Sequence, residues 1–375
     1  MAAMPSIERV ILITVERGGP STIDGIQGLT GVEHLGISTR LRWWGLLSRV
    51  DLLLRMPFLL ARLVKRERID LLNAKGSLAG GIAHVVSRLA HVPYMVESFE
   101  PHSAYMVDAG VWSKHGLYSS VMRRLEALQK RHALFLVTVT QNYRDTLIAE
   151  GVDAARIKII PSIVDLNQFA FDPSRRADIR EEYGWKDCIV GVYVGKFGGL
   201  YYDREAFSIF EQARAVFGGR FRLLLLTNES AQNVNERLDL IGFPVELAEV
   251  HFVPHEQVPQ WLSAADIAFS TIRYIPNGLY QSPVKDGEYW ANGLPILLTT
   301  GVSDDHQIIL REPWAGAIFD LGQPGSVQAA LKHMADLFHA GVDRERIMGL
   351  AREYRSIDIA RSVYAEIFDP PLPKA

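Results

Sequence analysis

Short apolar runs alternate with longer helical segments along most of this chain, and this alternation limits its fold more than any other feature. The runs show little polar alternation, as expected for strands that are buried on both faces of a parallel sheet. Strands are predicted at 10–15, 71–74, 94–97, 135–139 and 158–161 in the first half, and at 189–194, 221–226, 250–253, 267–270 and 296–299 in the second. Helices are predicted at 78–90, 115–132, 141–150, 203–217, 232–241, 256–263 and 284–292. We therefore expect an α/β protein with two Rossmann-like, doubly wound domains that face a cleft.

The length of 375 residues agrees with two domains, because it is well above that of a typical single domain. A polar, irregular stretch at 162–187 is the best position for the break between them. We expect domains at 1–165 and 166–345, followed by a helical segment, 346–375, that packs back on the first domain.

Composition and charge exclude several classes of protein. With 48% hydrophobic and 22% charged residues, the chain is neither disordered nor a coiled coil. A net charge of −3 disfavours a nucleic-acid partner. The single cysteine, Cys188, excludes an internal disulfide, and we find neither a signal peptide nor an apolar run long enough to span a bilayer. These features predict a cytoplasmic protein.

Paired glycines, Gly18 and Gly19, directly follow the first predicted strand. Glycines at such a position let backbone amides approach a ligand, usually an anionic one, but they also suit an ordinary turn. The spacing is not the glycine fingerprint of dinucleotide-binding proteins, so a nicotinamide-dependent dehydrogenase is disfavoured.

The segment 282–295 is more informative. Ser282 is a good N-cap, Pro283 a good first helical residue, and Gly293 a good helix stop, so a short helix is expected. Lys285 falls in its first turn, where the macrodipole disfavours a cation unless an anion is bound there. Glu288 lies on the same side, where a carboxylate can accept the two hydroxyls of a ribose. The alternative is a capped surface helix that carries a Lys–Glu pair.

Residues 282–295 resemble the donor-nucleotide helix of the retaining GT-B glycosyltransferases of the family 4 group. Other landmarks follow in the order of that family: a hinge motif at 159–169, a strand and loop at 193–196, and a segment beside the nucleotide base at 253–266. The resemblance implies a retaining transferase of the hexosyltransferase type, active in polysaccharide or glycoconjugate assembly. It further implies that the first domain binds a glycan or lipid-linked acceptor and the second a nucleotide sugar.

The same resemblance assigns roles in donor binding. Glu288 would anchor the ribose, while Lys285 and Lys196 would neutralise the diphosphate together with amides at the helix start. The further donor-binding candidates are Ser282, Val284, Gly195 and Tyr280. Two positions depart from the family: Tyr280 stands where an acid often contacts the sugar, and Tyr201 stands where a second lysine is common. No Asp-x-Asp pair and no histidine spacing suited to a metal is evident, so no cofactor is expected.

Two further segments are candidates for contact with the acceptor. Glu100 and His102 follow a predicted strand, and the resemblance places a histidine or an acid there as the catalytic group; a structural histidine is the alternative. Residues 40–68 carry eight basic side chains next to Trp43 and Trp44, a pattern that suits an anionic membrane surface or an ordinary basic helix packed on a sheet.

Two other functions remain open at this point. A UDP-sugar 2-epimerase has the same architecture, but we expect it to place more acids and histidines in the cleft. A catalytically inactive protein that binds nucleotide sugars would agree with the departures at Tyr201 and Tyr280.

Overall fold

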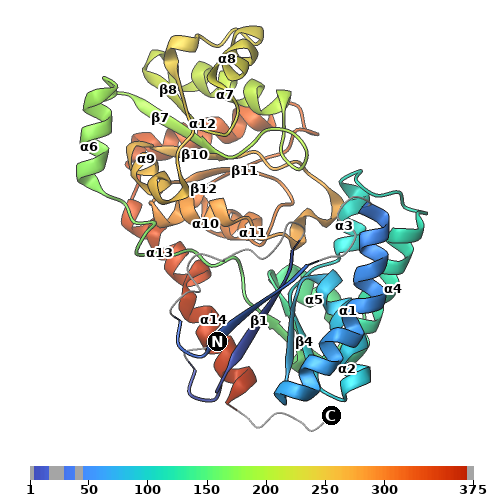
Figure 1. Cartoon of the computed structure of the whole chain (residues 1–375). Helices are drawn as coiled ribbons and strands as arrows, with labels where there is room; N and C mark the ends of the chain where they lie inside the picture. The colour runs from blue at the N-terminus through green and yellow to red at the C-terminus, as the bar shows by residue number, and fades with distance from the viewer. Residues whose placement is uncertain (1–3, 17–28, 39–44, 370–375) are drawn as a thin grey trace.

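The computed structural model describes residues 4–16, 29–38 and 45–369, which form two halves that each surround a parallel sheet (Figure 1). Gly18 and Gly19 lie outside the described residues, as do Trp43 and Trp44, so the predictions made for them are not addressed by the structure. The expected fold class is confirmed: both sheets are parallel and helices lie against them.

The sheet of the first half contains four parallel strands in sequence order, and a separate parallel pair lies at the N-terminus. The four strands are β3 (Leu72–Lys75), β4 (Tyr94–Phe99), β5 (Phe135–Thr138) and β6 (Ile157–Ile159), and the pair is β1 (Val10–Glu16) with β2 (Val32–Ser38). The connecting helices are α1 (Gly45–Glu67), α2 (Ser77–Ala90), α3 (His102–Asp108), α4 (Leu117–His132) and α5 (Gln141–Ala149).

The second half has a six-stranded sheet in the order β12-β11-β10-β7-β8-β9. Its strands are β7 (Ile189–Val194), β8 (Phe221–Leu226), β9 (Ala248–His251), β10 (Ile267–Ser270), β11 (Ile296–Thr299) and β12 (Gly316–Phe319). Its helices are α6 (Pro173–Glu182), α7 (Arg204–Phe217), α8 (Ala231–Leu240), α9 (Val258–Ala264), α10 (Val284–Ala291), α11 (Asp305–Arg311) and α12 (Ser326–Ala340). This order is that of the doubly wound fold, and the direction of winding reverses between β7 and β10.

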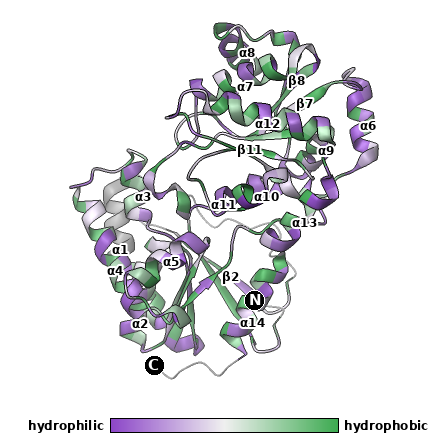
Figure 2. Ribbon diagram, turned by 180° about the vertical axis from the view of Figure 1, so that it is seen from behind, coloured by the Kyte–Doolittle hydropathy of each residue, from purple (hydrophilic) through white to green (hydrophobic). Residues whose placement is uncertain are grey.

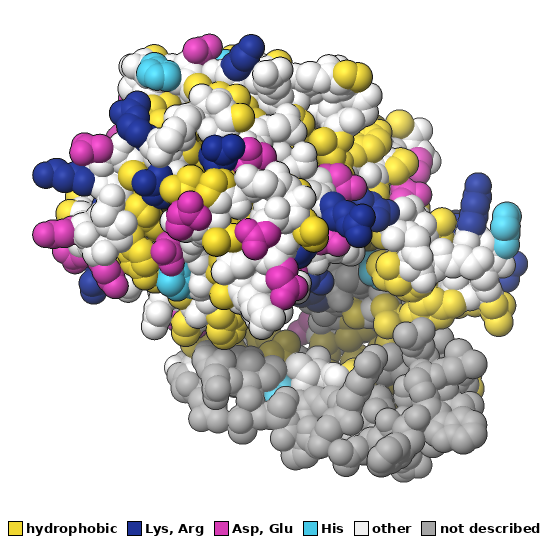
Figure 3. Space-filling view, turned by 90° about the horizontal axis from the view of Figure 1, so that it is seen from above, with side chains coloured by type: hydrophobic (Ala, Val, Ile, Leu, Met, Phe, Trp, Pro, Cys, Tyr) yellow, Lys and Arg dark blue, Asp and Glu magenta, His cyan; other side chains and the backbone are white. Residues whose placement is uncertain are grey.

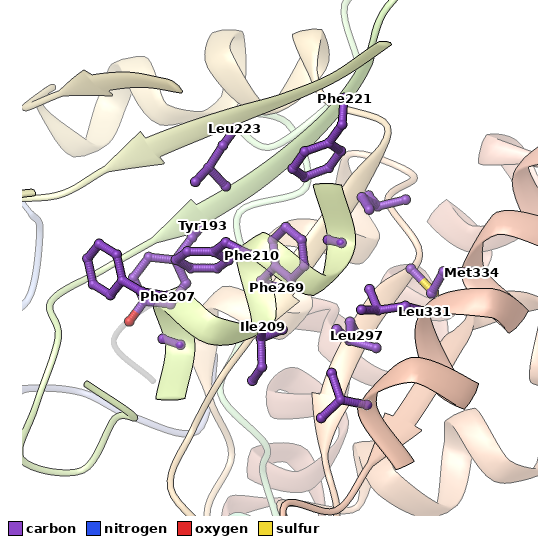
Figure 4. Packing of buried hydrophobic residues seen from close by; sticks show 14 of the residues in the cluster. Tyr193, Phe207, Ile209, Phe210, Phe221, Leu223, Phe269, Leu297, Leu331 and Met334 are labelled. Carbon is purple, nitrogen blue, oxygen red and sulfur yellow. The ribbon is translucent and has the colours of Figure 1, made fainter. Parts of the chain in front are cut away.

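Apolar side chains fill both faces of this second sheet. On one face, aromatic residues of β7, α7 and β10 interlock, among them Tyr193, Phe207, Phe210 and Phe269, and α12 adds Leu331 (Figure 4). On the other face, residues of α9, α10, α11 and the segment around Val164 form a second cluster. The buried strands are correspondingly hydrophobic, whereas α6, at the edge, is hydrophilic (Figure 2). Burial on both faces explains why these strands show no polar alternation.

Most predicted strands match the structure within a few residues, but some elements differ. The strand predicted at 250–253 is β9, which begins earlier, at Ala248. β2, β12 and α12 were not predicted. The basic segment 40–68 contains α1, which runs from Gly45 to Glu67 and continues through Pro57. Met56, Ala61 and Val64 pack against α2, and this packing outweighs the hydrogen bond that proline cannot donate.

The C-terminal segment forms two helices, which lie against different halves. α13 (Arg344–Arg355) packs against α10 of the second half, where Ile347 and Ala351 join the core. α14 (Ile357–Phe368) packs against the first sheet, where Ile367 contacts the cluster of Met95 and Val137. The expected helical segment is therefore two helices, because Ser356 caps a new helix at the crossing. Only the second of them packs on the first half, so this prediction was wrong for α13. The domain boundaries themselves stay a prediction.

Arg355, at the end of α13, joins three separate segments where the halves meet. Its guanidinium is almost fully buried and binds both carboxylate oxygens of Asp305, at 2.6 and 2.5 Å. It also donates to the Ser282 hydroxyl, and its carbonyl accepts a hydrogen bond from the amide of Val164. A single residue therefore connects α11, the segment before α10 and the chain that crosses between the halves.

Removing this arginine is expected to destabilise the protein strongly. Arg355→Ala leaves the buried Asp305 carboxylate without its cation, so the free energy of unfolding should fall by about 3–5 kcal/mol in chemical denaturation. Arg361→Ala, at an exposed ion pair with Asp358 on α14, is the matched control and should cost less than about 1 kcal/mol. Equal effects of the two substitutions would contradict a central role for Arg355.

Candidate active site

The candidate site lies at the point where the second sheet reverses its winding, between β7 and β10. The chain leaves β7 through Gly195 and leaves β10 through Thr271, at the carboxyl ends of two neighbouring strands. Tyr289 of α10 connects the ends of these strands, because its hydroxyl accepts the Val194 amide at 2.9 Å and donates to the Phe269 carbonyl at 3.4 Å. In open α/β sheets this position is where ligands bind. The structure therefore places α10 against the expected ligand position.

The start of α10 differs from the expectation. The helix begins at Val284, Pro283 is its N-cap, and Ser282 provides no cap. The Ser282 hydroxyl instead accepts hydrogen bonds from Arg355 and from the Ser162 amide, the latter at 3.0 Å, while its carbonyl accepts the Ser162 hydroxyl at 2.5 Å. The N-cap role was therefore wrong, because Ser282 ties the helix to the crossing segment. The first amides of α10 receive no side-chain cap within the described residues.

Lys285 lies in the first turn of α10, as predicted from the sequence. Its ammonium group lies 4.0 Å from the Tyr201 ring, 4.9 Å from the Tyr193 ring and 3.4 Å from the Val194 carbonyl oxygen. A side-chain carbon added to Gly195 would lie only 3.5 Å from the same nitrogen, so the ammonium lies directly over the end of β7. Burial lowers the pKa of Lys285, and the nearby carboxylates of Asp286 and Glu288 oppose this shift.

Glu288 is buried one turn further along the same helix, and its carboxylate has a histidine partner. His255 places Nε2 2.8 Å from Oε1 of Glu288, and the imidazole also packs against the Phe169 ring. Burial raises the pKa of Glu288, whereas the hydrogen bond with His255 lowers it. His255 itself is largely exposed, so this pair lies at the surface of the site. His255 therefore holds one oxygen of Glu288 and orients the carboxylate that is predicted to bind a ribose.

The remaining donor-binding candidates are divided between this region and the first half. Lys196 has an exposed side chain, and its carbonyl accepts the Tyr193 hydroxyl at 2.6 Å. Val284 is exposed at the first position of α10. Tyr280, in contrast, packs its ring against Tyr143 and lies within hydrogen-bond distance, 3.1 Å, of the Thr146 hydroxyl, both on α5 of the first half. A donor contact for each of these residues stays a prediction.

Glu100 and His102 form a pair at the carboxyl end of β4. His102 begins α3, and its Nδ1 lies 3.1 Å from Oε1 of Glu100. This hydrogen bond raises the pKa of His102 against the opposing effect of burial. The next residue, Ser103, donates its amide and hydroxyl to the buried Glu126 of α4, which fixes the start of α3. His102 is therefore held and half-buried, with Glu100 available as its acceptor.

The carboxyl ends of the two sheets face each other. Asp108, at the end of α3, accepts a hydrogen bond from Asn277, which follows β10. Asp304 accepts the amides of Gln141 and Asn142 at 2.6 and 3.1 Å, so a carboxylate of the second half caps α5 of the first. Burial raises the pKa of Tyr105 on α3 to about 12, and Glu100 and Tyr201 add to this rise. The pair Glu100–His102 and the Lys285 region therefore lie on facing elements.

Three residues that matter here were not singled out as site residues from the sequence. His255 contacts Glu288, and Tyr201 contacts Lys285. Both residues lie in loops, where no regular spacing of side chains predicts such a contact. Asp286 is completely buried in α10, and neither of its carboxylate oxygens accepts a hydrogen bond from the described residues. Burial and the neighbouring Asp305 raise the pKa of Asp286. The sequence could not show that Asp286 is buried next to Asp305, because this contact depends on how α11 packs beside α10.

Neither a metal-binding cluster nor a membrane-spanning helix is present among the described residues. Among the residues that the structure describes, no group of three or more His, Cys, Asp or Glu side chains is placed to hold a metal ion. No helix within the described ranges is long and apolar enough to cross a bilayer. Among the described residues on the face shown in Figure 3, acidic and basic side chains are interspersed and do not gather by sign.

Comparison with known proteins agrees with this geometry. Residues 8–162 match the family model described as a glycosyl transferase 4-like domain. The structure is similar to sucrose-phosphate synthase of Thermosynechococcus elongatus, with a TM-score of 0.70, 16% identity and coverage of 96% of this chain and 89% of that one. It is also similar to Anabaena HepE in complex with UDP-glucose, with a TM-score of 0.66, 14% identity and coverage of 90% and 86%. The fold is that of the GT-B glycosyltransferases.

A curated relative is similar in sequence as well. The UDP-Gal:alpha-D-GlcNAc-diphosphoundecaprenol alpha-1,3-galactosyltransferase of Escherichia coli is 23% identical over 293 residues, which cover 74% of this chain and 69% of that protein. The family match lies in the first half, whereas this alignment is too long to be confined to it. Both halves of the GT-B fold are therefore present.

The partnership of His102 with Glu100 can be tested by titration. Glu100→Gln removes the negative acceptor, so the pKa of His102 should fall, because burial then acts with less opposition. At neutral pH the protonated fraction of His102 should decrease accordingly. NMR titration of the imidazole measures this, with His333 of the second half as an internal control. An unchanged His102 titration would show that Glu100 does not set its charge.

Proposed function

We propose that this protein is a glycosyltransferase that moves a hexose from a UDP-sugar to a lipid-linked or glycan acceptor. The observation that supports this most directly is Lys285 and Glu288 on one helix, placed where the second sheet reverses its winding. A cation and a carboxylate at this spacing match the diphosphate and ribose of a nucleotide sugar. The glycosyl transferase 4-like domain in the first half supports the transferase over an epimerase or an inactive binding protein.

The donor and acceptor classes come from the similar proteins. The printed name of the Escherichia coli relative gives UDP-Gal as donor and a sugar diphosphoundecaprenol as acceptor, and HepE was solved with UDP-glucose. We extend the class of each ligand to this chain: a UDP-hexose on the second half and a lipid-linked sugar on the first. The product then belongs to polysaccharide or glycoconjugate assembly.

The proposed reaction retains the configuration of the transferred sugar. The bond between the anomeric carbon and the diphosphate oxygen breaks while the acceptor oxygen bonds to that carbon from the same face. The acceptor proton ends on the leaving phosphate oxygen. Lys285, Lys196 and the uncapped amides of α10 stabilise the charge that develops on the diphosphate, so these groups replace a metal cofactor. Glu100 and His102 orient the reacting hydroxyls from the facing half.

Nucleotide binding by variants tests this assignment. Glu288→Ala should weaken uridine, UDP and the UDP-sugar alike, by about 2–3 kcal/mol, because the carboxylate binds only the ribose. Lys285→Ala should weaken UDP and the UDP-sugar but leave uridine nearly unaffected, because its partner is the diphosphate. Isothermal calorimetry measures all three ligands.

A matched control is available next to the site. Glu256→Ala removes an exposed carboxylate beside His255 and should leave all three affinities unchanged. If Glu288→Ala binds every ligand as the wild type does, α10 is a structural helix and the proposed donor site is wrong. UDP release in the presence of a lipid-linked sugar then separates a transferase from a binding protein, because only the former turns over.

A lipid-linked acceptor would bring the protein to a membrane surface, and we propose that α1 makes that contact. The side of α1 that faces away from α2 exposes Leu54 by 66% and Phe58 by 61%, and Arg62 and Lys65 continue the same stripe at helical spacing. Apolar and basic side chains on one exposed face are typical of helices that lie on anionic lipids. The protein would therefore be cytoplasmic and peripheral to the membrane.

Vesicle binding tests this contact. Changing Arg62, Lys65 and Arg66 together to Gln should weaken binding to anionic vesicles by about 3 kcal/mol at low salt, because each basic residue near such a surface contributes roughly 1 kcal/mol. Added salt should weaken the wild type in the same direction. The control changes three exposed residues of the second half, Arg175, Lys186 and Lys332, to Gln. Binding that falls equally in the two triple variants would argue against α1.

A further inference from the structure

The close contacts of the Lys285 ammonium group are two aromatic rings and a backbone carbonyl, and not carboxylates. The Tyr201 ring lies 4.0 Å away and the Tyr193 ring 4.9 Å away. In the described part of the chain, no ion pair of Lys285 with a carboxylate is found, although Asp286 and Glu288 are near enough to raise its pKa. The cation therefore lies in a partly buried place where rings provide the close contacts.

The backbone fixes the position of Tyr201. Its amide donates to the Gly198 carbonyl at 3.2 Å, and Tyr201 forms an isolated antiparallel bridge with Ile272. On either side, the Arg273 amide donates to the Leu200 carbonyl at 2.9 Å and the Tyr202 amide to the Thr271 carbonyl at 3.0 Å. The loop that follows β7 is thus hydrogen-bonded to the segment that follows β10. The ring is held at the point where the sheet reverses its winding.

Tyr201 also faces the first half. Tyr105 on α3 is affected by the charges of both Glu100 and Tyr201, so these side chains lie near one another across the two halves. Tyr201 is half-buried there. The ring therefore lies beside the cation of α10, on a loop that is close to α3 of the first half.

We propose that Tyr201 is a positioning residue that holds Lys285 over the end of β7 by its aromatic face and keeps the full cationic charge available for the donor diphosphate. A carboxylate in the same position would hold the ammonium more strongly but would compete with the phosphate oxygens for it. An aromatic ring attracts a cation through its quadrupole without neutralising it. Tyr201 stands where a second lysine is common in the family, and here its ring instead holds the ammonium of Lys285. This inference rests on the proposed function, because it needs a diphosphate at Lys285.

Variants that keep or remove the ring test the inference. Tyr201→Phe keeps the aromatic face and should bind UDP within about twofold of the wild type. Tyr201→Leu removes the face and should weaken UDP about 3- to 30-fold while leaving uridine unchanged, because uridine carries no phosphate. Tyr201→Met is the second ring-free variant, used if the leucine variant fails to fold. Tyr274→Leu, at an exposed tyrosine after β10, is the matched control and should change neither affinity.

A pH series provides a readout that packing alone would not move. The groups that face the ammonium are Tyr193, Tyr201 and the Val194 carbonyl, together with Asp286 and Glu288 on its own helix. Without the Tyr201 ring the charged form of Lys285 is less stable, so its pKa should fall further. UDP affinity should then begin to decline at a lower pH in Tyr201→Leu than in the wild type or in Tyr201→Phe.

The outcomes separate this inference from the proposed function. If Lys285→Ala weakens UDP binding but both ring-free variants bind as the wild type does, the role of Tyr201 is overturned and the donor site stands. Equal weakening of UDP and uridine by Tyr201→Leu would also overturn it, because the ring would then act by packing. If the wild type binds no UDP, the donor site and the role of Tyr201 are both wrong.

Discussion

The buried ion pair between Arg355 and Asp305 is the interaction on which the arrangement of the site depends. A buried guanidinium is favourable only when acceptors pair with it, and here the acceptors for its two terminal nitrogens come from α11 and from Ser282 before α10. Ser282 in turn holds Ser162 of the crossing segment. Next to Asp305, Asp304 caps α5 of the first half. Two consecutive acids therefore connect the segment before α10 and helix α5 of the first half, so the relative position of the halves and the start of α10 are set together.

The parallel sheets could be predicted because burial on both faces leaves a direct mark on the sequence. β7 and β11 are continuous apolar runs, and α10 carries a glycine stop that only a helix end requires. β12 has four residues, and its pairing with β11 comes from tertiary contact that no local pattern records. Ser282 shows the same limit: its type suits an N-cap, but Arg355, distant in sequence, takes its hydroxyl. Local patterns in the sequence could be interpreted, whereas a hydrogen bond from a distant residue such as Arg355 to the Ser282 hydroxyl could not be predicted.

The charged residues of the candidate site could be proposed from spacing, but their partners could not. Lys285 and Glu288 are one helical turn apart, which is visible in the sequence. His255 and Tyr201 reach them from loops after other strands, and only the order of the second sheet brings those loops together. Tyr280 illustrates the reverse case, because a residue close to α10 in sequence points into the first half. Proximity along the chain thus points to the candidate groups themselves but not to the groups that orient them.

The partners of these two charges share one physical property: neither removes the charge that a nucleotide would need. The aromatic face of Tyr201 attracts the ammonium of Lys285 without neutralising its charge. His255 holds one oxygen of Glu288, and the other remains able to accept a hydroxyl. Asp286, between them in sequence, is buried without a hydrogen-bond partner among the described residues, and burial raises its pKa. The direct contacts of the ammonium are two rings and the Val194 carbonyl, which leave Lys285 able to pair with an anion that arrives from outside.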